Sequence, residues 1–125
     1  MTKIPNDPTI GATSERLNEL AFSFKKSQAM VAALECGLFT ALSEGANSPS
    51  EIANHCGIDP ETADRLLIIC KAMELVREVG GSNVNLDDVE RFLVRDKPTY
   101  FGDYLRFTVP AEFKEWLGFA DNLQD

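Results

Sequence analysis

The sequence predicts a mostly α-helical fold in which a helix–turn–helix is followed by one small β-hairpin. Three observations lead to this class. Apolar residues recur at spacings of three and four along most of the 125 residues, which is the period of a helix. Two helix starts with proline in the first turn follow one another, at residues 48–51 and 59–61. A single β-branched stretch, residues 75–86, contains a glycine pair and interrupts the helical period.

The N-terminal part predicts one long helix. Residues 1–12 are polar, contain prolines, and are expected to be a mobile tail. Thr13 is a suitable N-cap, and the helix is expected to reach Cys36, where Gly37 supplies the C-cap. A short helix over residues 38–42 follows. The stripe on the long helix consists of Leu17, Leu20, Ala21, Phe24, Gln28, Val31 and Leu34.

Two capped helices form the helix–turn–helix. Residues 48–51 read Ser-Pro-Ser-Glu, which combines an N-cap, a first-turn proline and a capping-box acid, and they predict a helix over about residues 49–55. Asp-Pro-Glu at residues 59–61 predicts a second helix to about Met73. Its residues 66–70 are all apolar and wrap more than a full turn. We therefore expect this helix to be buried nearly all round, either inside the domain or against a partner.

The remaining chain predicts a β-hairpin and further helices. Residues 75–79 and 84–86 flank the turn sequence Gly-Gly-Ser, which is typical of a hairpin. Asp87 is expected to cap the next helix, Pro98 to open another segment, and Pro110 to start the last helix. The layout is a winged-helix domain over residues 13–96 that includes an added long helix at its front, followed by helices at residues 97–125.

Composition and charge argue against nucleic-acid-binding and membrane-associated functions. Apolar residues make up 44% and charged residues 26%, as in one soluble domain. A net charge of −8 disfavours nucleic acid and anionic membranes as partners, because both are polyanionic. No apolar run approaches the roughly 18–20 residues that cross a bilayer, and the N-terminus lacks a secretory signal. A cytoplasmic location is expected.

The sequence lacks the usual signatures of a reactive site. It has no G-x-G-x-x-G, P-loop or G-x-S-x-G motif. Cys36, Cys56 and Cys70 do not have the spacing of a zinc site, and His55 is the only histidine. The acidic pair at residues 87–88 is better explained by helix capping than by metal binding. We therefore predict no catalytic, cofactor-binding or metal-binding residue in this chain.

The predicted second helix of the helix–turn–helix is a poor DNA reader. Its first turns hold Asp59, Glu61 and Asp64, which would repel phosphates. The wing, residues 80–85, has no lysine or arginine to grip a backbone. A ligand-responsive transcriptional regulator remains an alternative on topology alone.

Short segments follow one another in a fixed order along residues 17–105: Ser-Gln-Ala at 27–29, Leu-Glu-Cys-Gly-Leu-Phe-Thr-Ala-Leu at 34–42, Ser-Glu-Ile-Ala at 50–53, Gly-Ile-Asp-Pro at 57–60, Arg-Leu-Leu at 65–67 and Met-Glu-Leu-Val at 73–76. In this order they resemble the N-terminal dimerisation domain of small-molecule O-methyltransferases that use S-adenosylmethionine. The resemblance implies a homodimer that exchanges helices, and a pocket for a small aromatic substrate.

The same resemblance places S-adenosylmethionine in a separate C-terminal domain of a full-length parent. No residue here matches that domain's glycine-rich loop or catalytic histidine. We expect a piece of a longer enzyme rather than a free-standing partner-binding domain, which is the further alternative.

Two sets of residues are candidates for function. An apolar stripe without cover marks an interface, so we expect the dimer contact at Leu17, Leu20, Phe24 and Val31. The alternative is that this stripe packs only within its own chain. From the resemblance, the aromatic surface before the cofactor domain is expected to line the substrate pocket, through Phe107, Phe113 and Trp116. A core between the last helices and the winged helix is the alternative.

Overall fold

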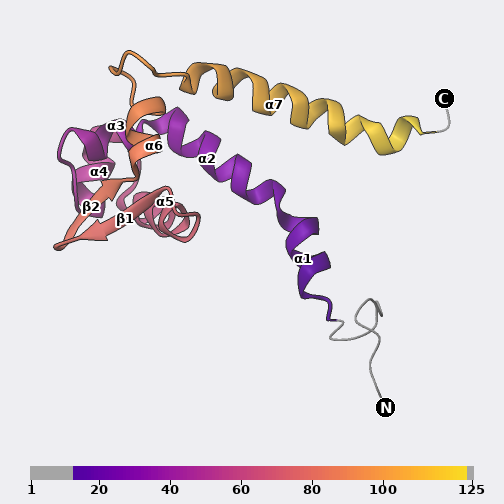
Figure 1. Ribbon diagram of the computed structural model, residues 1–125, viewed down its shortest axis with the longest axis horizontal. Coiled ribbons are helices and arrows are strands. Elements are labelled where there is room, and N and C mark those ends of the chain that lie inside the picture. The colour runs from indigo at the N-terminus through magenta and orange to yellow at the C-terminus, as the bar shows by residue number, and fades with distance from the viewer. Residues whose placement is uncertain (1–12, 124–125) are drawn as a thin grey trace.

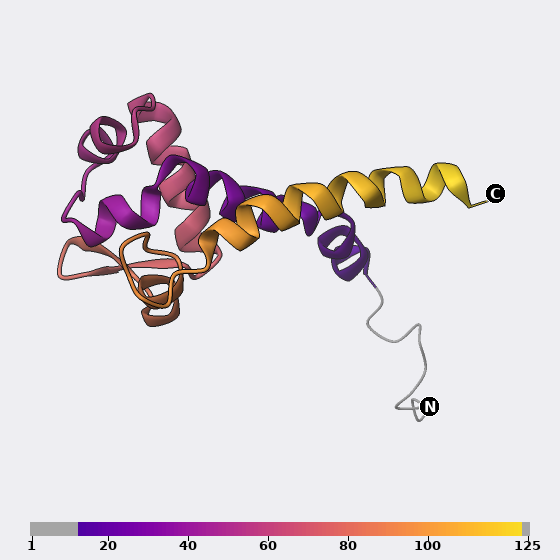
Figure 2. The ribbon, with the colours of Figure 1, turned by 90° about the horizontal axis from the view of Figure 1, so that it is seen from above.

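The computed structural model describes residues 13–123, which form a winged-helix core with two helical arms (Figures 1 and 2). The predicted tail at residues 1–12 lies outside the described residues. The mostly helical class with one two-stranded hairpin is confirmed. The elements are α1 (Glu15–Phe22), α2 (Phe24–Cys36), α3 (Leu38–Ser43), α4 (Pro49–Cys56), α5 (Pro60–Ala72), β1 (Val76–Val79), β2 (Ser82–Asn85), α6 (Asp87–Phe92), α7 (Gly102–Phe119) and the 3-10 turn η1 (Ala120–Asn122).

The helix–turn–helix forms as its caps predict. Ser48 Oγ accepts a hydrogen bond from the Glu51 backbone N–H at 3.1 Å, and the Glu51 carboxylate accepts one from the Ser48 N–H at 3.0 Å. Asp59 likewise accepts from the Thr62 N–H at 3.2 Å. These bonds satisfy donors that a helix N-terminus leaves unpaired, which fixes where α4 and α5 begin.

The predicted long helix is interrupted at Ser23, so the expectation of one unbroken helix is wrong. Ser23 keeps helical dihedral angles, but its Oγ donates to the Leu20 carbonyl at 2.9 Å. Its backbone N–H donates to the same carbonyl at 3.4 Å. Serine bonding back to the preceding turn bends helices. Figure 1 shows a change of direction between α1 and α2, the two helices that Ser23 separates in the sequence.

Two predicted caps are occupied by neighbouring residues. Ser14, not Thr13, is the N-cap of α1, although Thr13 Oγ1 accepts a hydrogen bond from the Glu15 N–H at 3.3 Å. Leu86, not Asp87, precedes α6, so Asp87 is the first helical residue. Asp87 in the first turn of α6 still interacts favourably with the helix dipole. Its presence therefore predicted the start of the helix to within one residue.

Helix α7 runs through Pro110, so the expectation that the last helix starts at this proline is wrong. An internal proline removes one hydrogen bond and costs about 3 kcal/mol. The helix continues because one face keeps packing on α2 on both sides of the proline. Leu105, Val109 and Phe113 are half-buried along that face, whereas Pro110 is exposed.

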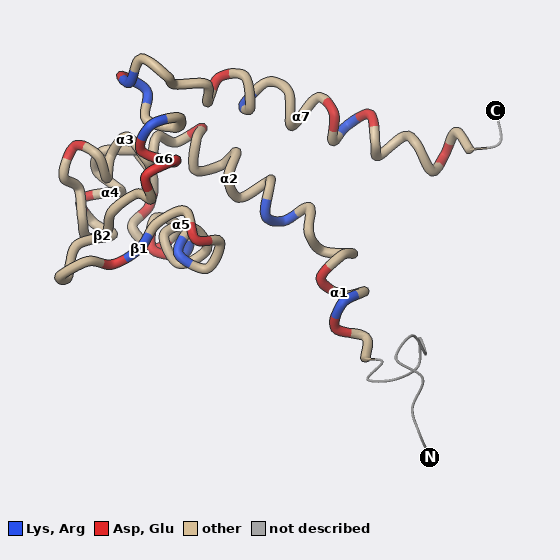
Figure 3. The backbone as a smooth tube through the Cα atoms, viewed as in Figure 1, with Lys and Arg blue, Asp and Glu red and all other residues tan. Residues whose placement is uncertain are grey.

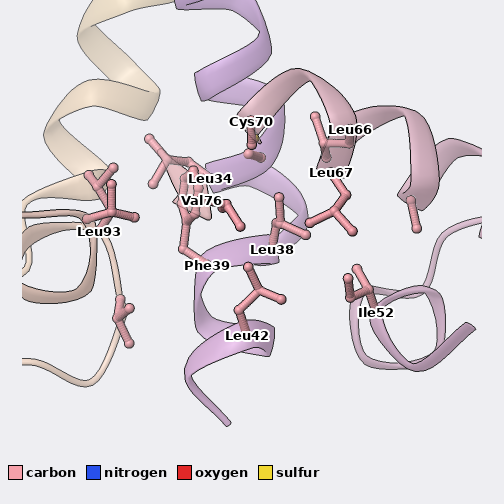
Figure 4. Packing of buried hydrophobic residues seen from close by; sticks show 14 of the residues in the cluster. Leu34, Leu38, Phe39, Leu42, Ile52, Leu66, Leu67, Cys70, Val76 and Leu93 are labelled. Atoms are coloured by element: carbon pink, nitrogen blue, oxygen red, sulfur yellow. The ribbon is translucent and has the colours of Figure 1, made fainter. Parts of the chain in front are cut away.

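The buried core lies entirely within the winged helix. Every buried apolar residue among the described ones falls between Ala33 and Val94. Phe39, Leu38 and Ile52 are at most 1% exposed and occupy its centre (Figure 4). The hairpin closes the core from one side, with Val76 paired to Asn85. The Asn85 amide donates to the Phe39 carbonyl at 2.9 Å, which ties the wing to α3.

Two arginines join the arms to the core. Arg95 donates to the carbonyls of Leu34 and Glu35 at 3.0 and 3.2 Å, which satisfies the C-terminal end of α2. Arg106 of α7 contacts the Glu35 carboxylate at 2.9 Å and Asp103 at 2.8 Å. The start of α7 is thereby held beside the end of α2.

Gly37 allows α2 and α3 to meet at a sharp turn, since its φ of 85° lies in the left-handed region. We expect Gly37→Ala to lower the free energy of unfolding by about 1–2 kcal/mol, because a side chain is strained there. Gly118→Ala is the matched control: it lies inside α7, and an added Cβ would meet only Asn122 Nδ2, at 3.6 Å. Denaturant unfolding of both variants checks this, and equal stabilities of Gly37→Ala and the wild type would contradict it.

The ion pair between Glu35 and Arg106 predicts a pH dependence. The hydrogen bond and charge of Arg106 lower the pKa of Glu35 from 4.5. A carboxylate with a lowered folded-state pKa contributes stability above its unfolded pKa, and that stability is lost as pH falls through the folded value. Wild type should therefore lose more stability than Glu35→Gln between about pH 6 and about pH 3. The difference is small because the carboxylate is exposed. Parallel unfolding curves at both pH values would contradict the assignment.

Candidate dimerisation surface

Among the described residues, little covers the N-terminal end of the predicted stripe. No residue of α1 is buried, and Leu17 and Leu20 are 59% and 65% exposed. Phe24, at the start of α2, is 44% exposed, and Val31 is half-buried. Burial increases only toward the C-terminal end of α2, where the helix enters the core. The stripe is therefore an apolar surface that nothing in the described chain covers at its N-terminal end.

The two candidate sets meet at one point. The rings of Phe24 and Phe113 stack with their centroids 6.1 Å apart. This contact joins the beginning of α2 to the middle of α7, residues that are far apart in the sequence. Sequence reasoning assigned the two rings to different sites, because helical period says which face a residue occupies but not which distant helix it meets.

The three aromatic residues of α7 do not share one face. Phe107 and Phe113 are six residues apart, which places them about 120° apart around the helix axis, so they lie on different faces. Phe113 is half-buried on the α2 side, whereas Phe107 is 72% exposed. Trp116 is 67% exposed and packs against Phe119, with ring centroids 5.1 Å apart. Neither Phe107 nor Trp116 is part of the core of this chain.

An apolar cavity that the sequence did not predict lies where α7 begins. It has a volume of about 290 Å³. Phe92 and Phe101 line this cavity, and their rings pack edge to face with centroids 5.8 Å apart. No sequence signal marked it, because its walls come from α2, α6, α7 and the segment after α5. The lining residues are Met30, Leu75, Asp88, Val89, Phe92, Leu93, Phe101 and Leu105.

Helix α5 is not buried all round in the single chain. Ile68 and Ile69 are 57% and 42% exposed, while Leu66, Leu67 and Cys70 on the opposite face are buried. Of the two expected settings, burial inside the domain is therefore wrong for this outer face. Figure 3 shows that Lys and Arg positions are interspersed with Asp and Glu positions along the described chain. An exposed isoleucine pair is also unsuited to a DNA-reading helix, which needs polar side chains there.

The polar groups of the described residues offer little reactivity. Burial, together with the neighbouring Cys36, raises the pKa of Cys56 and of Cys70 to about 12. These thiols stay protonated at neutral pH and are poor nucleophiles.

The described residues also show no metal-binding cluster or membrane-spanning helix. His55 is paired with Glu44. Within residues 13–123 no group of three or more metal-binding side chains comes together. None of the helices there combines the length and apolarity that crossing a bilayer requires.

Comparison with curated proteins identifies relatives. The chain is 35% identical over 101 residues to 3-hydroxy-5-methyl-1-naphthoate 3-O-methyltransferase of Streptomyces sahachiroi, which covers 81% of this chain and 29% of that relative. It is 28% identical over 115 residues to acetylserotonin O-methyltransferase of Bos taurus. That alignment covers 87% of this chain and 33% of the relative. The chain thus spans about a third of the length of these relatives.

Solved structures share the fold. Human N-acetylserotonin methyltransferase, solved in complex with SAM, superposes with a TM-score of 0.78 at 24% identity, covering 98% of this chain and 36% of that one. PigF, solved with SAH, superposes with a TM-score of 0.80 at 21% identity. This superposition covers 90% of the present chain and 37% of PigF. Residues 18–94, most of the winged helix and its N-terminal arm, match the family described as the O-methyltransferase dimerisation domain. The chain belongs to this dimerisation-domain family.

Proposed function

We propose that this chain is the dimerisation and substrate-lid module of an S-adenosylmethionine-dependent methyltransferase that acts on a small aromatic molecule. The family implies a homodimer. The observation that carries the proposal is the bare stripe on α1, where Leu17 and Leu20 are more than half exposed. An isolated helix of eight residues is unstable in water. A second copy that covers α1 supplies the packing that its own chain does not.

The dimer contact is built from α1, α2 and α7. Leu17, Leu20 and Phe24 extend the apolar surface away from the core, and Val31 continues it toward the core. Because Phe24 stacks on Phe113, α7 contributes to the same surface. Obligate interfaces bury about 2,000 Å² or more. Figures 1 and 2 show both arms leaving the core on the same side, so both are available to one interface.

The aromatic side chains of α7 form the substrate-lid part of the proposal. Phe107, Phe113 and Trp116 would line the pocket at the boundary with the catalytic domain of the parent enzyme. Flat aromatic substrates gain affinity and orientation from stacking against such rings. Two relatives are methyltransferases named for a hydroxynaphthoate and an aminohydroxybenzoate, which are flat aromatic acids. In this proposal the chain supplies shape and apolar surface, and S-adenosylmethionine binds outside its residues.

Sedimentation tests the homodimer. Wild type is expected to sediment at about twice 13.8 kDa. The Leu20→Asp variant should sediment as a monomer. Burying an unpaired carboxylate in the dimer contact is unfavourable by more free energy than the apolar contact of one side chain supplies. Asn18→Asp is the matched control, since it places the same charge on another face of α1 and should leave the dimer intact. A dimer that survives Leu20→Asp, or a monomeric wild type, would contradict the proposal.

Fluorescence of Trp116, the only tryptophan, tests the aromatic surface. In the monomeric Leu20→Asp variant, its emission should be that of an exposed indole and should be quenched readily by acrylamide. Moving the tryptophan to the half-buried position 113, by Phe113→Trp with Trp116→Phe, should give bluer and better protected emission. A blue-shifted, protected signal from Trp116 in the proven monomer would make it a core residue and would remove it from the pocket.

A further inference from the structure

We propose that the side chains of Tyr100, Asp103 and Arg106 form a latch that sets the direction in which α7 leaves the core, and that the latch closes only because residue 102 is glycine. The contacts that define this latch lie within one chain. The inference is therefore independent of the proposed homodimer, and a monomeric wild type would leave it standing.

The segment that joins the core to α7 is irregular but anchored. Residues 93–101 contain no helix or strand (Figure 1). The Phe101 N–H donates to the Phe92 carbonyl at 2.9 Å, which brings the segment back to the end of α6, and the Tyr100 N–H donates to the Lys97 carbonyl at 3.1 Å. These bonds fix where α7 begins. The direction of its axis depends on contacts further along the helix.

The ring of Tyr100 lies over Gly102, the first residue of α7. Gly102 is buried, and a Cβ added to it would lie 2.5 Å from Cε1 of Tyr100 and 2.8 Å from its Cζ and Oη. Carbon atoms in contact are normally about 3.5–4.0 Å apart. An alanine at position 102 therefore cannot coexist with the present position of the ring. Because these atoms are the far end of a side chain, we expect the ring to move and the fold to remain.

Hydrogen bonds hold the ring in place and extend the latch to α2. The Tyr100 hydroxyl donates to Asp103 Oδ1 at 3.1 Å, and Arg106 Nη1 donates to the same oxygen at 2.8 Å. Burial and the neighbouring Asp103 raise the pKa of Tyr100, so its hydroxyl stays a proton donor at neutral pH. Arg106 also donates through Nε and Nη2 to the two carboxylate oxygens of Glu35, at 2.9 and 3.2 Å. Such a fork fixes orientation as well as distance.

The direction of α7 at its base decides which contacts form farther along. Its 18 residues span about 27 Å, and Phe113 lies about 16 Å from the start. A tilt of about 20° at Gly102 would move Phe113 by roughly 6 Å. The Phe113 ring centroid is 6.1 Å from that of Phe24, so this movement is large enough to separate the two rings. The latch thereby positions the aromatic contact that joins the two arms.

The other contacts of α7 attach it to α2 without replacing the latch. Leu105 and Val109 are half-buried on the side that packs on α2. Pro110 cannot donate a backbone hydrogen bond, which weakens the helix near its middle. Opening the latch is therefore expected to leave α7 attached but free to change direction, while the winged-helix core stays folded.

Hydrogen exchange of α7 amides tests the latch by the sign of the effect. Alanine is a better helix former than glycine, so propensity alone predicts slower exchange in Gly102→Ala. The latch predicts the opposite: exchange at residues 103–108 should be at least about fivefold faster than in wild type, as expected for the loss of one hydrogen bond. Amides of α4 and α5 should exchange at the wild-type rate. Gly118→Ala is the matched control and should not be faster, because its added Cβ would meet only Asn122 Nδ2, at 3.6 Å.

Removing the ring distinguishes the latch from a general intolerance of alanine. The three atoms nearest to the added Cβ all belong to Tyr100, so Tyr100→Ala removes the closest contacts. In this background, Gly102→Ala should slow the exchange of residues 103–108. Slower exchange in the single variant Gly102→Ala, or equal acceleration with and without the Tyr100 ring, would overturn the inference.

Tryptophan fluorescence reports the direction of α7. With Phe113→Trp and Trp116→Phe, the only tryptophan occupies the half-buried position 113. Adding Gly102→Ala should shift its emission to the red and make it easier to quench with acrylamide, whereas adding Gly118→Ala should change neither. Unchanged emission together with faster exchange would show that residue 102 affects only local stability, and would overturn the positioning role.

Discussion

Helix α2 is buried at one end and bare at the other, and the arrangement of the molecule depends on this asymmetry. Ala33 and Leu34 enter the winged-helix core, whereas Phe24 and all of α1 lie outside it. The core is complete without the arm, because its buried residues lie between positions 33 and 94. Within the described residues, α1 has no buried side chain, and Phe24 packs only in part, against Phe113 of α7. Most of the apolar surface of the arm therefore stays accessible to another surface.

The second arm is held in place by contacts at two separate points. At its base, Arg106 pairs with Glu35, and Arg95 satisfies the last carbonyls of α2. Farther along, Phe113 stacks on Phe24. Exposed ion pairs contribute little free energy by themselves, but here they orient a helix whose apolar face already packs on α2. The two arms consequently form one combined surface, and a change in either arm affects the other.

The chemistry of the chain agrees with a role in shape and assembly. Its buried thiols have raised pKa values, and its exposed features are aliphatic and aromatic side chains. In an enzyme that methylates a flat aromatic molecule, such a module would exclude water from the substrate and join two catalytic halves.

The sequence by itself determined the local elements. The capping box at Ser48 and the N-cap at Asp59 set where α4 and α5 begin, the Gly-Gly-Ser turn set the hairpin, and Gly37 ended α2, because these signals act within a few residues. The expectation of a helix start at Pro110 was wrong, because the packing of α7 on α2 outweighs the tendency of proline to interrupt a helix. Only the tertiary structure decided that Phe24 meets Phe113, that Ile68 stays exposed, and that a cavity forms beside Phe92. Those outcomes depend on which distant helices approach one another, and helical period carries no information about that.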